Sequence, residues 1–137
     1  MKPLNPPAVT LIVTVLISLA FWVAVFTPAH ADILTDVQSA SRSVPGICGD
    51  KAYAAVHMLE RAGVPERSLA YLILRGGYGR GAHVVVIVFD GPDATVLDSY
   101  YRGLTRYSDY PPGWVVNMMP ASTPLADLRN PYGRLGR

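Results

Sequence analysis

The chain has one cysteine, three histidines and few charged residues, at 16% of the sequence. A single cysteine excludes an internal disulfide, and the paired cysteines of most structural zinc sites are missing too. Cys48 is therefore an intermolecular disulfide partner, a buried filler, a metal ligand or a reactive thiol. The formal net charge is only +2 and the basic residues are scattered, so the composition predicts no nucleic-acid partner.

Charge is also missing from the N-terminal segment, because no Asp, Glu, Lys or Arg lies between Lys2 and Asp32. An apolar run over 8–26 is followed by small residues up to Ala31, at the positions that signal peptidase recognises. We predict that residues 1–31 are a signal peptide and that the mature domain is periplasmic or secreted. The run is also about long enough to cross a bilayer, so an uncleaved N-terminal membrane anchor is the alternative.

One small domain follows this segment. We assign it to 32–128 and predict a flexible tail over 129–137. Weak helical periodicity over 32–45 predicts a short helix followed by a loop. From Asp50 onward, apolar residues recur every three or four positions, which predicts an amphipathic helix that ends at Gly63. The single cysteine therefore lies at the N-terminal end of this helix.

Four strand-like runs come after the helix, at 69–74, 83–89, 94–97 and 114–118. The second run is almost wholly apolar, so we predict a central strand that is covered on both faces. The turn after it returns the third run antiparallel to the second, and the chain from Pro120 is predicted to be irregular. One helix followed by a meandering antiparallel sheet indicates an α+β fold.

These elements predict a catalytic triad of Cys48, His83 and Asp98. A thiol attacks as the thiolate, and a helix N-terminus or an adjacent imidazolium lowers its pKa. His83 opens the apolar strand, and Asp98 ends the strand that returns beside it, so the two can be cross-strand neighbours. We expect Cys48 to be the nucleophile, His83 the general base and acid, and Asp98 the carboxylate that orients the imidazole.

Simpler interpretations of the same residues stay open. One alternative is that Cys48 is a small buried hydrophobic residue. Another is that a zinc or other metal site is formed by Cys48, His83 and Asp98. The competing base His57 lies nine residues after the cysteine, beside the apolar stripe, and we interpret it as a surface histidine. The glycine-rich segment 76–81 lacks the context of a phosphate-binding loop, so we interpret it as a mobile connection.

The residues around these motifs also resemble a known family. Gly-Ile-Cys-Gly-Asp-Lys-Ala at 46–52 is similar to a Gly-Asp-Cys-Glu-Asp-Tyr-Ala nucleophile segment. Four later segments are similar to further motifs of the same family: a post-helix turn at 62–65, a histidine strand at 81–85, a Val-Leu-Asp-Asn segment at 95–99 and a closing strand with Gly-Trp at 107–117. This order resembles the bacterial transglutaminase-like cysteine proteinases. The resemblance implies a papain-like fold, the same triad, and a protein or peptide substrate.

Two differences from the family bear on cofactors. Its acidic residues beside the cysteine, associated with calcium in the adhesin-cleaving members, are here Ile47 and Gly49, and only Asp50 keeps its charge. We therefore predict no cofactor, with calcium as the alternative that the resemblance implies. The predicted function is an exported cysteine peptidase that cleaves amide bonds through a thioester. The alternative is an inactive domain that serves as a peptide-binding or regulatory module.

Overall fold

The computed structural model describes residues 31–75 and 81–132. The predicted signal peptide up to residue 30, most of the glycine-rich connection and the end of the predicted tail lie outside these ranges. Within them, no helix has the length and apolar character needed to span a membrane.

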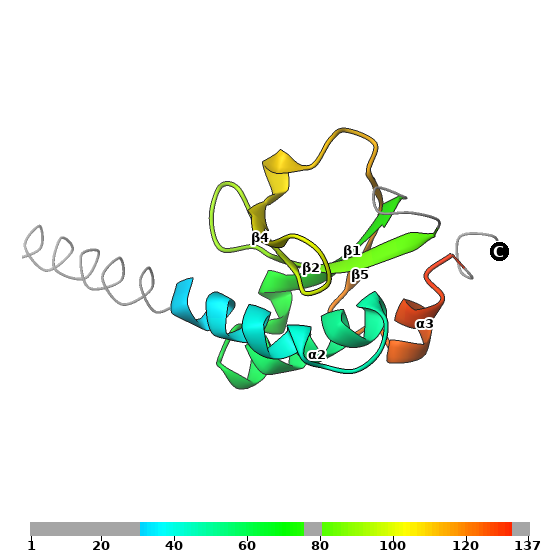
Figure 1. Cartoon of the computed structure of the whole chain (residues 1–137). Coiled ribbons are helices and arrows are strands. Elements are labelled where there is room, and N and C mark those ends of the chain that lie inside the picture. The colour runs from blue at the N-terminus through cyan, green and yellow to red at the C-terminus, as the bar shows by residue number, and fades with distance from the viewer. Residues whose placement is uncertain (1–30, 76–80, 133–137) are drawn as a thin grey trace, which may run out of the picture. The chain divides into compact units, whose positions relative to one another are not determined.

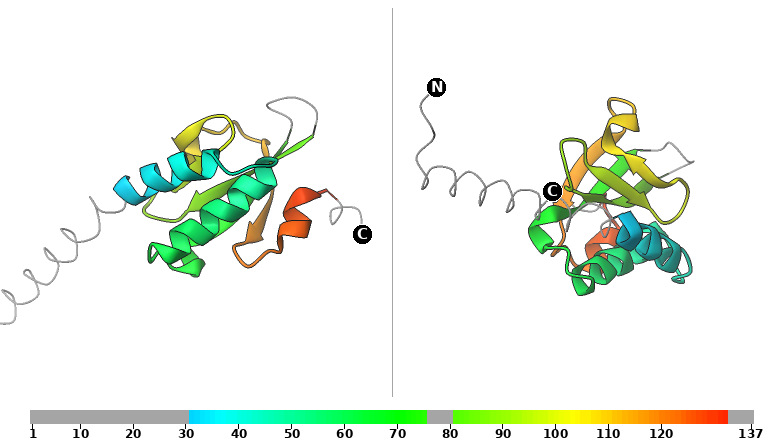
Figure 2. Two further views of the ribbon diagram at one scale, coloured as in Figure 1. Left: turned by 60° about the horizontal axis from the view of Figure 1, so that its bottom comes forward. Right: turned by 90° about the vertical axis from the view of Figure 1, so that its left-hand side faces the viewer.

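The described chain combines helices with one antiparallel sheet, as expected for an α+β fold. It is helical over 31–42. The elements that follow are α2 (Cys48–Arg61), η1 (Glu66–Ser68), β1 (Leu69–Arg75), β2 (Ala82–Val88), β3 (Thr95–Asp98), β4 (Gly103–Arg106), η2 (Tyr107–Asp109), β5 (Val115–Pro120) and α3 (Leu125–Arg129). The α-helices lie on one side of the sheet (Figure 1; Figure 2).

The sheet has five strands in the order β4-β3-β2-β1-β5, and all neighbouring strands are antiparallel. All four predicted strands are present within about two residues of their expected ends. β4 was not predicted, because this short edge strand has no apolar run and its residues alternate between half-buried and exposed. The antiparallel pairing of β2 with β3 places the start of β2 and the end of β3 at the same end of the two strands.

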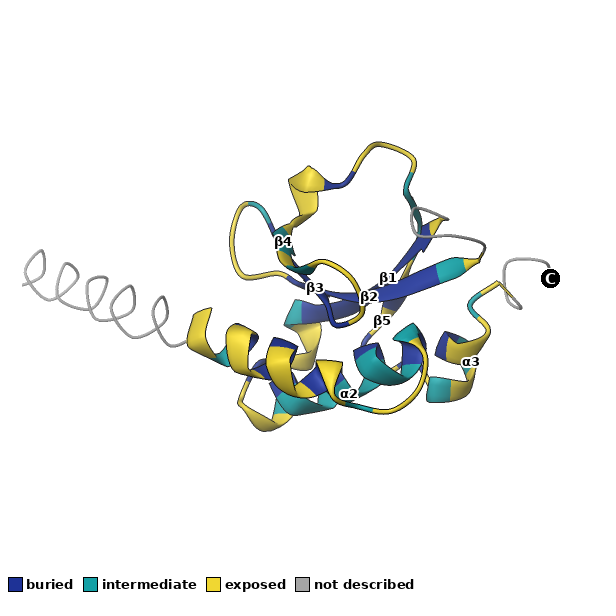
Figure 3. Cartoon of the chain, in the orientation of Figure 1, coloured by how far each residue is buried: buried dark blue, intermediate teal, exposed yellow. Residues whose placement is uncertain are grey.

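Strand β2 is the middle strand of the sheet and is buried on both faces, as its sequence predicts. Val84, Val86 and Val88 pack into the core beneath α2, whereas Val85 and Ile87 join a second core on the opposite face. The burial of each such side chain contributes about 1.5–3 kcal/mol. Buried positions fill β1 and β2, while the helices are exposed on their outer side (Figure 3). The strand therefore holds its first residues on a rigid backbone.

Helix α2 begins at Cys48, two residues before the apolar periodicity starts. The backbone N–H of Ile47 donates to Asp50 Oδ2 at 3.0 Å, so an aspartate three residues along the chain caps the helix start. The helix ends at Arg61 with Ala62 as its C-cap, and Gly63 follows with a φ of 93°, a left-handed conformation that favours glycine.

The segment after Pro120 is not wholly irregular, and the prediction was wrong there. Pro124 introduces the five-residue helix α3, which is too short for a periodic pattern to reveal it. Leu128 of α3 is only 1% exposed, so this single apolar side chain anchors the helix in the core. Arg129, which the sequence assigned to a flexible tail, belongs to α3, and its Nη2 lies 2.6 Å from Asp50 Oδ1.

Candidate active site

The three residues predicted as a triad come from three elements that meet where β2 begins and β3 ends. Cys48 is the first residue of α2, His83 the second residue of β2, and Asp98 the last residue of β3. His83 Nε2 lies 3.0 Å from Asp98 Oδ2, and the His83 side chain also hydrogen-bonds to Cys48. Packing α2 on β2, and pairing β2 with β3, are thus sufficient to bring the three side chains together.

His83 and Asp98 are diagonal neighbours rather than directly opposite. The pairing of β2 with β3 aligns Val86 with Leu97, so one further step sets Asp98 opposite Val85, two residues from His83. Diagonal neighbours in a sheet are within reach of long side chains. The imidazole spans this offset, which the sequence alone did not specify.

The Asp98 carboxylate is held from two sides. Its Oδ1 accepts the backbone N–H groups of Tyr100 and Tyr101, both at 2.9 Å, which leaves Oδ2 facing His83. Burial opposes ionisation of Asp98, whose side chain is fully inaccessible, but the hydrogen bonds from His83 and from these amides outweigh it. The pKa of Asp98 therefore lies below its usual value, and the group is a carboxylate at neutral pH.

His83 is correspondingly easier to protonate. Burial of the ring lowers its pKa, but hydrogen bonds with Asp98 and Cys48 and their negative charges raise the pKa to about 9. Since Nε2 faces Asp98, Nδ1 is the ring nitrogen that remains for the thiol. The aspartate thus fixes which nitrogen exchanges a proton with the cysteine.

The pKa of the Cys48 thiol is lowered, whereas that of His83 is raised. Burial raises the thiol's pKa, but the His83 side chain and backbone hydrogen bonds with Val84 and Gly49 more than offset this, so its pKa lies below the usual value. Acceptance of a hydrogen bond favours the thiolate, as does the adjacent helix N-terminus. The two shifts together favour the pair of thiolate and imidazolium over thiol and neutral imidazole, and the thiolate is the form in which a cysteine nucleophile attacks.

The helix start also supplies hydrogen-bond donors. The first N–H groups of an α-helix have no partner within the helix, and the Cys48 N–H is one of them. This N–H group is therefore a hydrogen-bond donor next to the sulfur, available to an anionic group bound there. The first helical position thus places both the thiol and a backbone donor at the same point.

Two tyrosines that the sequence analysis did not single out flank the imidazole. The rings of Tyr100 and Tyr101 lie 6.2 and 5.0 Å from the His83 ring, both in edge-on arrangements. Each tyrosine is nearly half exposed, so they form a rim between the buried imidazole and solvent. Their place directly after Asp98 was the only signal for them in the sequence.

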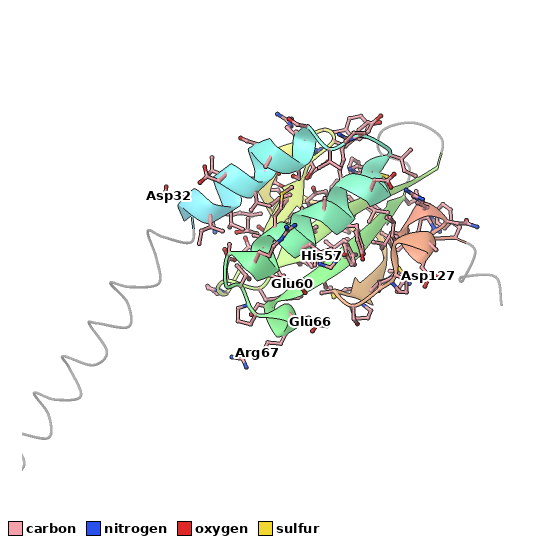
Figure 4. All side chains as sticks on the ribbon, turned by 90° about the horizontal axis from the view of Figure 1, so that it is seen from below. Asp32, His57, Glu60, Glu66, Arg67 and Asp127 are labelled. Carbon is pink, nitrogen blue, oxygen red and sulfur yellow. The ribbon has the colours of Figure 1, made fainter. Side chains whose placement is uncertain are left out.

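The other candidate base does not join the site. His57 contacts Glu60 on the same helix, with 3.0 Å between Nδ1 and Oε2, and its side chain is 42% exposed (Figure 4). This agrees with its interpretation as a surface histidine. No group of three or more His, Cys, Asp or Glu side chains within 31–75 and 81–132 is arranged to hold a metal ion.

We compared the chain with protein-family models, with curated proteins and with solved structures, and none of the three comparisons found a match.

Proposed function

We propose that the protein is a cysteine peptidase of the transglutaminase-like, papain-like type, exported from the cytoplasm by its N-terminal segment. The observation that carries the proposal is the ordered series of contacts from Cys48 through His83 to Asp98. A buried carboxylate, an imidazole with a raised pKa and a thiol with a lowered pKa are the groups that thiol-dependent acyl transfer requires.

The proposed reaction begins when the Cys48 thiolate attacks the carbonyl carbon of a peptide amide, which places a negative charge on the carbonyl oxygen. The His83 imidazolium gives its proton to the leaving amine as the C–N bond breaks, and a thioester forms on Cys48. A water molecule, deprotonated by His83, then attacks the thioester. This releases the carboxylic acid and restores the thiolate and imidazolium.

The arrangement of elements supports a papain-like fold, because the nucleophile helix packs against the strand that carries the histidine. The fold itself does not define the reaction, so the proposal depends on the site. The substrate class is a protein or peptide outside the cytoplasm, which rests on the resemblance and on the predicted signal peptide. No cofactor takes part in the proposed reaction.

Peptide cleavage tests this proposal. We expect the purified protein to hydrolyse members of a peptide library, with Cys48→Ser and His83→Ala reducing the rate by at least about a thousandfold, as is typical for loss of a triad member. His57→Ala is the matched control, because His57 is a histidine of the same domain outside the site, and it should retain full activity. Peptide binding without cleavage, unaffected by Cys48→Ser, would instead support the inactive binding module.

A further inference from the structure

The turn that carries Asp98 is tied to the helical segment 31–42 by buried side chains. Gln38 Nε2 donates to the backbone oxygen of Asp98 at 2.7 Å. Three residues further along the helix, the Ser41 and Ser99 hydroxyl oxygens lie 2.6 Å apart. Residues three apart share one face of a helix, so the helix holds the turn at two successive points.

The burial of these groups indicates that the contacts are strong. Gln38, Ser41 and Ser99 are 8%, 0% and 7% exposed. A buried amide or hydroxyl costs free energy unless it is hydrogen-bonded, and a hydrogen bond is stronger where water is excluded. Gln38 Oε1 has no hydrogen-bond partner within the described part of the chain, so this side chain is a poor source of stability overall. What Gln38 does supply is one donor, directed at Asp98.

We propose that Gln38 and Ser41 are positioning residues of the triad, which hold the turn after β3 so that the Asp98 carboxylate faces His83. Their hydrogen bonds reach the Asp98 backbone and the Ser99 hydroxyl, so they act through Asp98 and its turn. The consequence for catalysis rests on the proposed function, whereas the effect on His83 does not. The helix that directly follows the predicted signal peptide is thereby part of the active-site machinery.

The physical link runs through the backbone of the turn. Its carbonyl at Asp98 accepts from Gln38, and its N–H groups at Tyr100 and Tyr101 fix Oδ1 of the same aspartate. If the turn loses its outer support, the amides and the carboxylate move together, and Oδ2 no longer keeps its 3.0 Å contact with the imidazole of His83. The ionisable groups around that imidazole are Asp98, the Cys48 thiol and the two tyrosines.

The test compares the protein with Gln38→Met, which keeps a side chain of similar volume and removes the donor, and with Ser41→Ala. Ser39→Ala is the matched control, since Ser39 is exposed on the same helix. The readout is the pKa of His83, followed through its ring C–H signals by NMR and assigned with His83→Ala. We expect Gln38→Met and Ser41→Ala to lower this pKa, by about one unit for Gln38→Met, while the control leaves it unchanged; one unit is a tenfold change in the protonation equilibrium.

A double-mutant cycle separates positioning from a general loss of structure. In the Asp98→Asn background, Gln38→Met should produce no further change in the His83 pKa, because the group through which it acts is gone. An unchanged pKa in both single variants, or an equal fall with and without Asp98, overturns the proposal. If thermal unfolding shows that Gln38→Met does not fold, Ser41→Ala and its own cycle decide the question. Absence of peptide cleavage together with the expected pKa changes would refute the proposed function alone.

Discussion

The close approach of α2 to α3 makes Gly49 a position where one methyl group should be costly. A Cβ at residue 49 would lie 2.6 Å from the Leu128 carbonyl oxygen and 2.9 Å from its carbon. Both atoms are backbone, so no side-chain rotation relieves the clash. Overpacking of this kind typically costs about 1–3 kcal/mol, and we expect the upper part of that range here.

Helix propensity opposes this effect and is the smaller of the two. Alanine is favoured over glycine within a helix by about 1 kcal/mol, and less at the first turn. The net expectation for Gly49→Ala is therefore a loss of about 2 kcal/mol, which for a domain of this size lowers the melting temperature by roughly 8–12 °C.

Thermal unfolding followed by circular dichroism measures the change. Gly91→Ala is the matched control, because no atom lies within 4 Å of a Cβ placed at Gly91, and its stability should stay within about 0.5 kcal/mol of the parent. A melting temperature for Gly49→Ala equal to or above that of the parent would refute the packing of α3 on α2. The same contact leaves no room for an acidic side chain at position 49.

Three further perturbations probe the site and its support. Asp98→Asn should lower the pKa of His83 from about 9 toward its ordinary range, because the largest favourable partner of the imidazolium is removed, and an NMR titration detects this. Arg129→Met should lower the free energy of unfolding by about 0.5–1 kcal/mol at neutral pH, since the contact with Asp50 is partly exposed. That contact lowers the pKa of Asp50, so the difference in unfolding free energy between variant and parent, measured in urea, should vanish as the pH falls below the ordinary Asp range. Tyr71→Phe should leave stability unchanged or raise it by up to about 1 kcal/mol, as the Tyr71 hydroxyl is buried without a hydrogen-bond partner among the described residues, and a clear loss in urea unfolding would contradict this.

Local patterns were enough to predict the elements that carry the triad. In α2 apolar residues recur every three or four positions, and in β2 they form a continuous run. Each pattern reflects which side chains of that one element are buried, so it can be identified in the sequence without knowledge of the rest of the fold. The hairpin between β2 and β3 followed from a short turn. Because Cys48, His83 and Asp98 each sit at an end of such an element, their meeting could be anticipated from chain order and turn length.

Features that depend on tertiary contact were not visible in the sequence. Helix α3 and edge strand β4 are too short to show a period, and their stability comes from packing and pairing. The support of Asp98 by Gln38 joins residues 60 positions apart, and nothing near Gln38 in the sequence indicates a partner. The diagonal offset between His83 and Asp98 depends on the register of β2 against β3. A shift of this register by two residues leaves every side chain on the same face of the sheet, so hydrophobic alternation does not distinguish the two registers.

The rate of Cys48 alkylation by iodoacetamide as a function of pH tests most directly whether this sulfur, imidazole and carboxylate work as one unit. We predict that the rate rises with a midpoint well below 8.5, the ordinary pKa of a free thiol, and that His83→Ala returns the midpoint to that value. A midpoint near 8.5 in the unaltered protein, or one that His83→Ala leaves in place, would contradict the account.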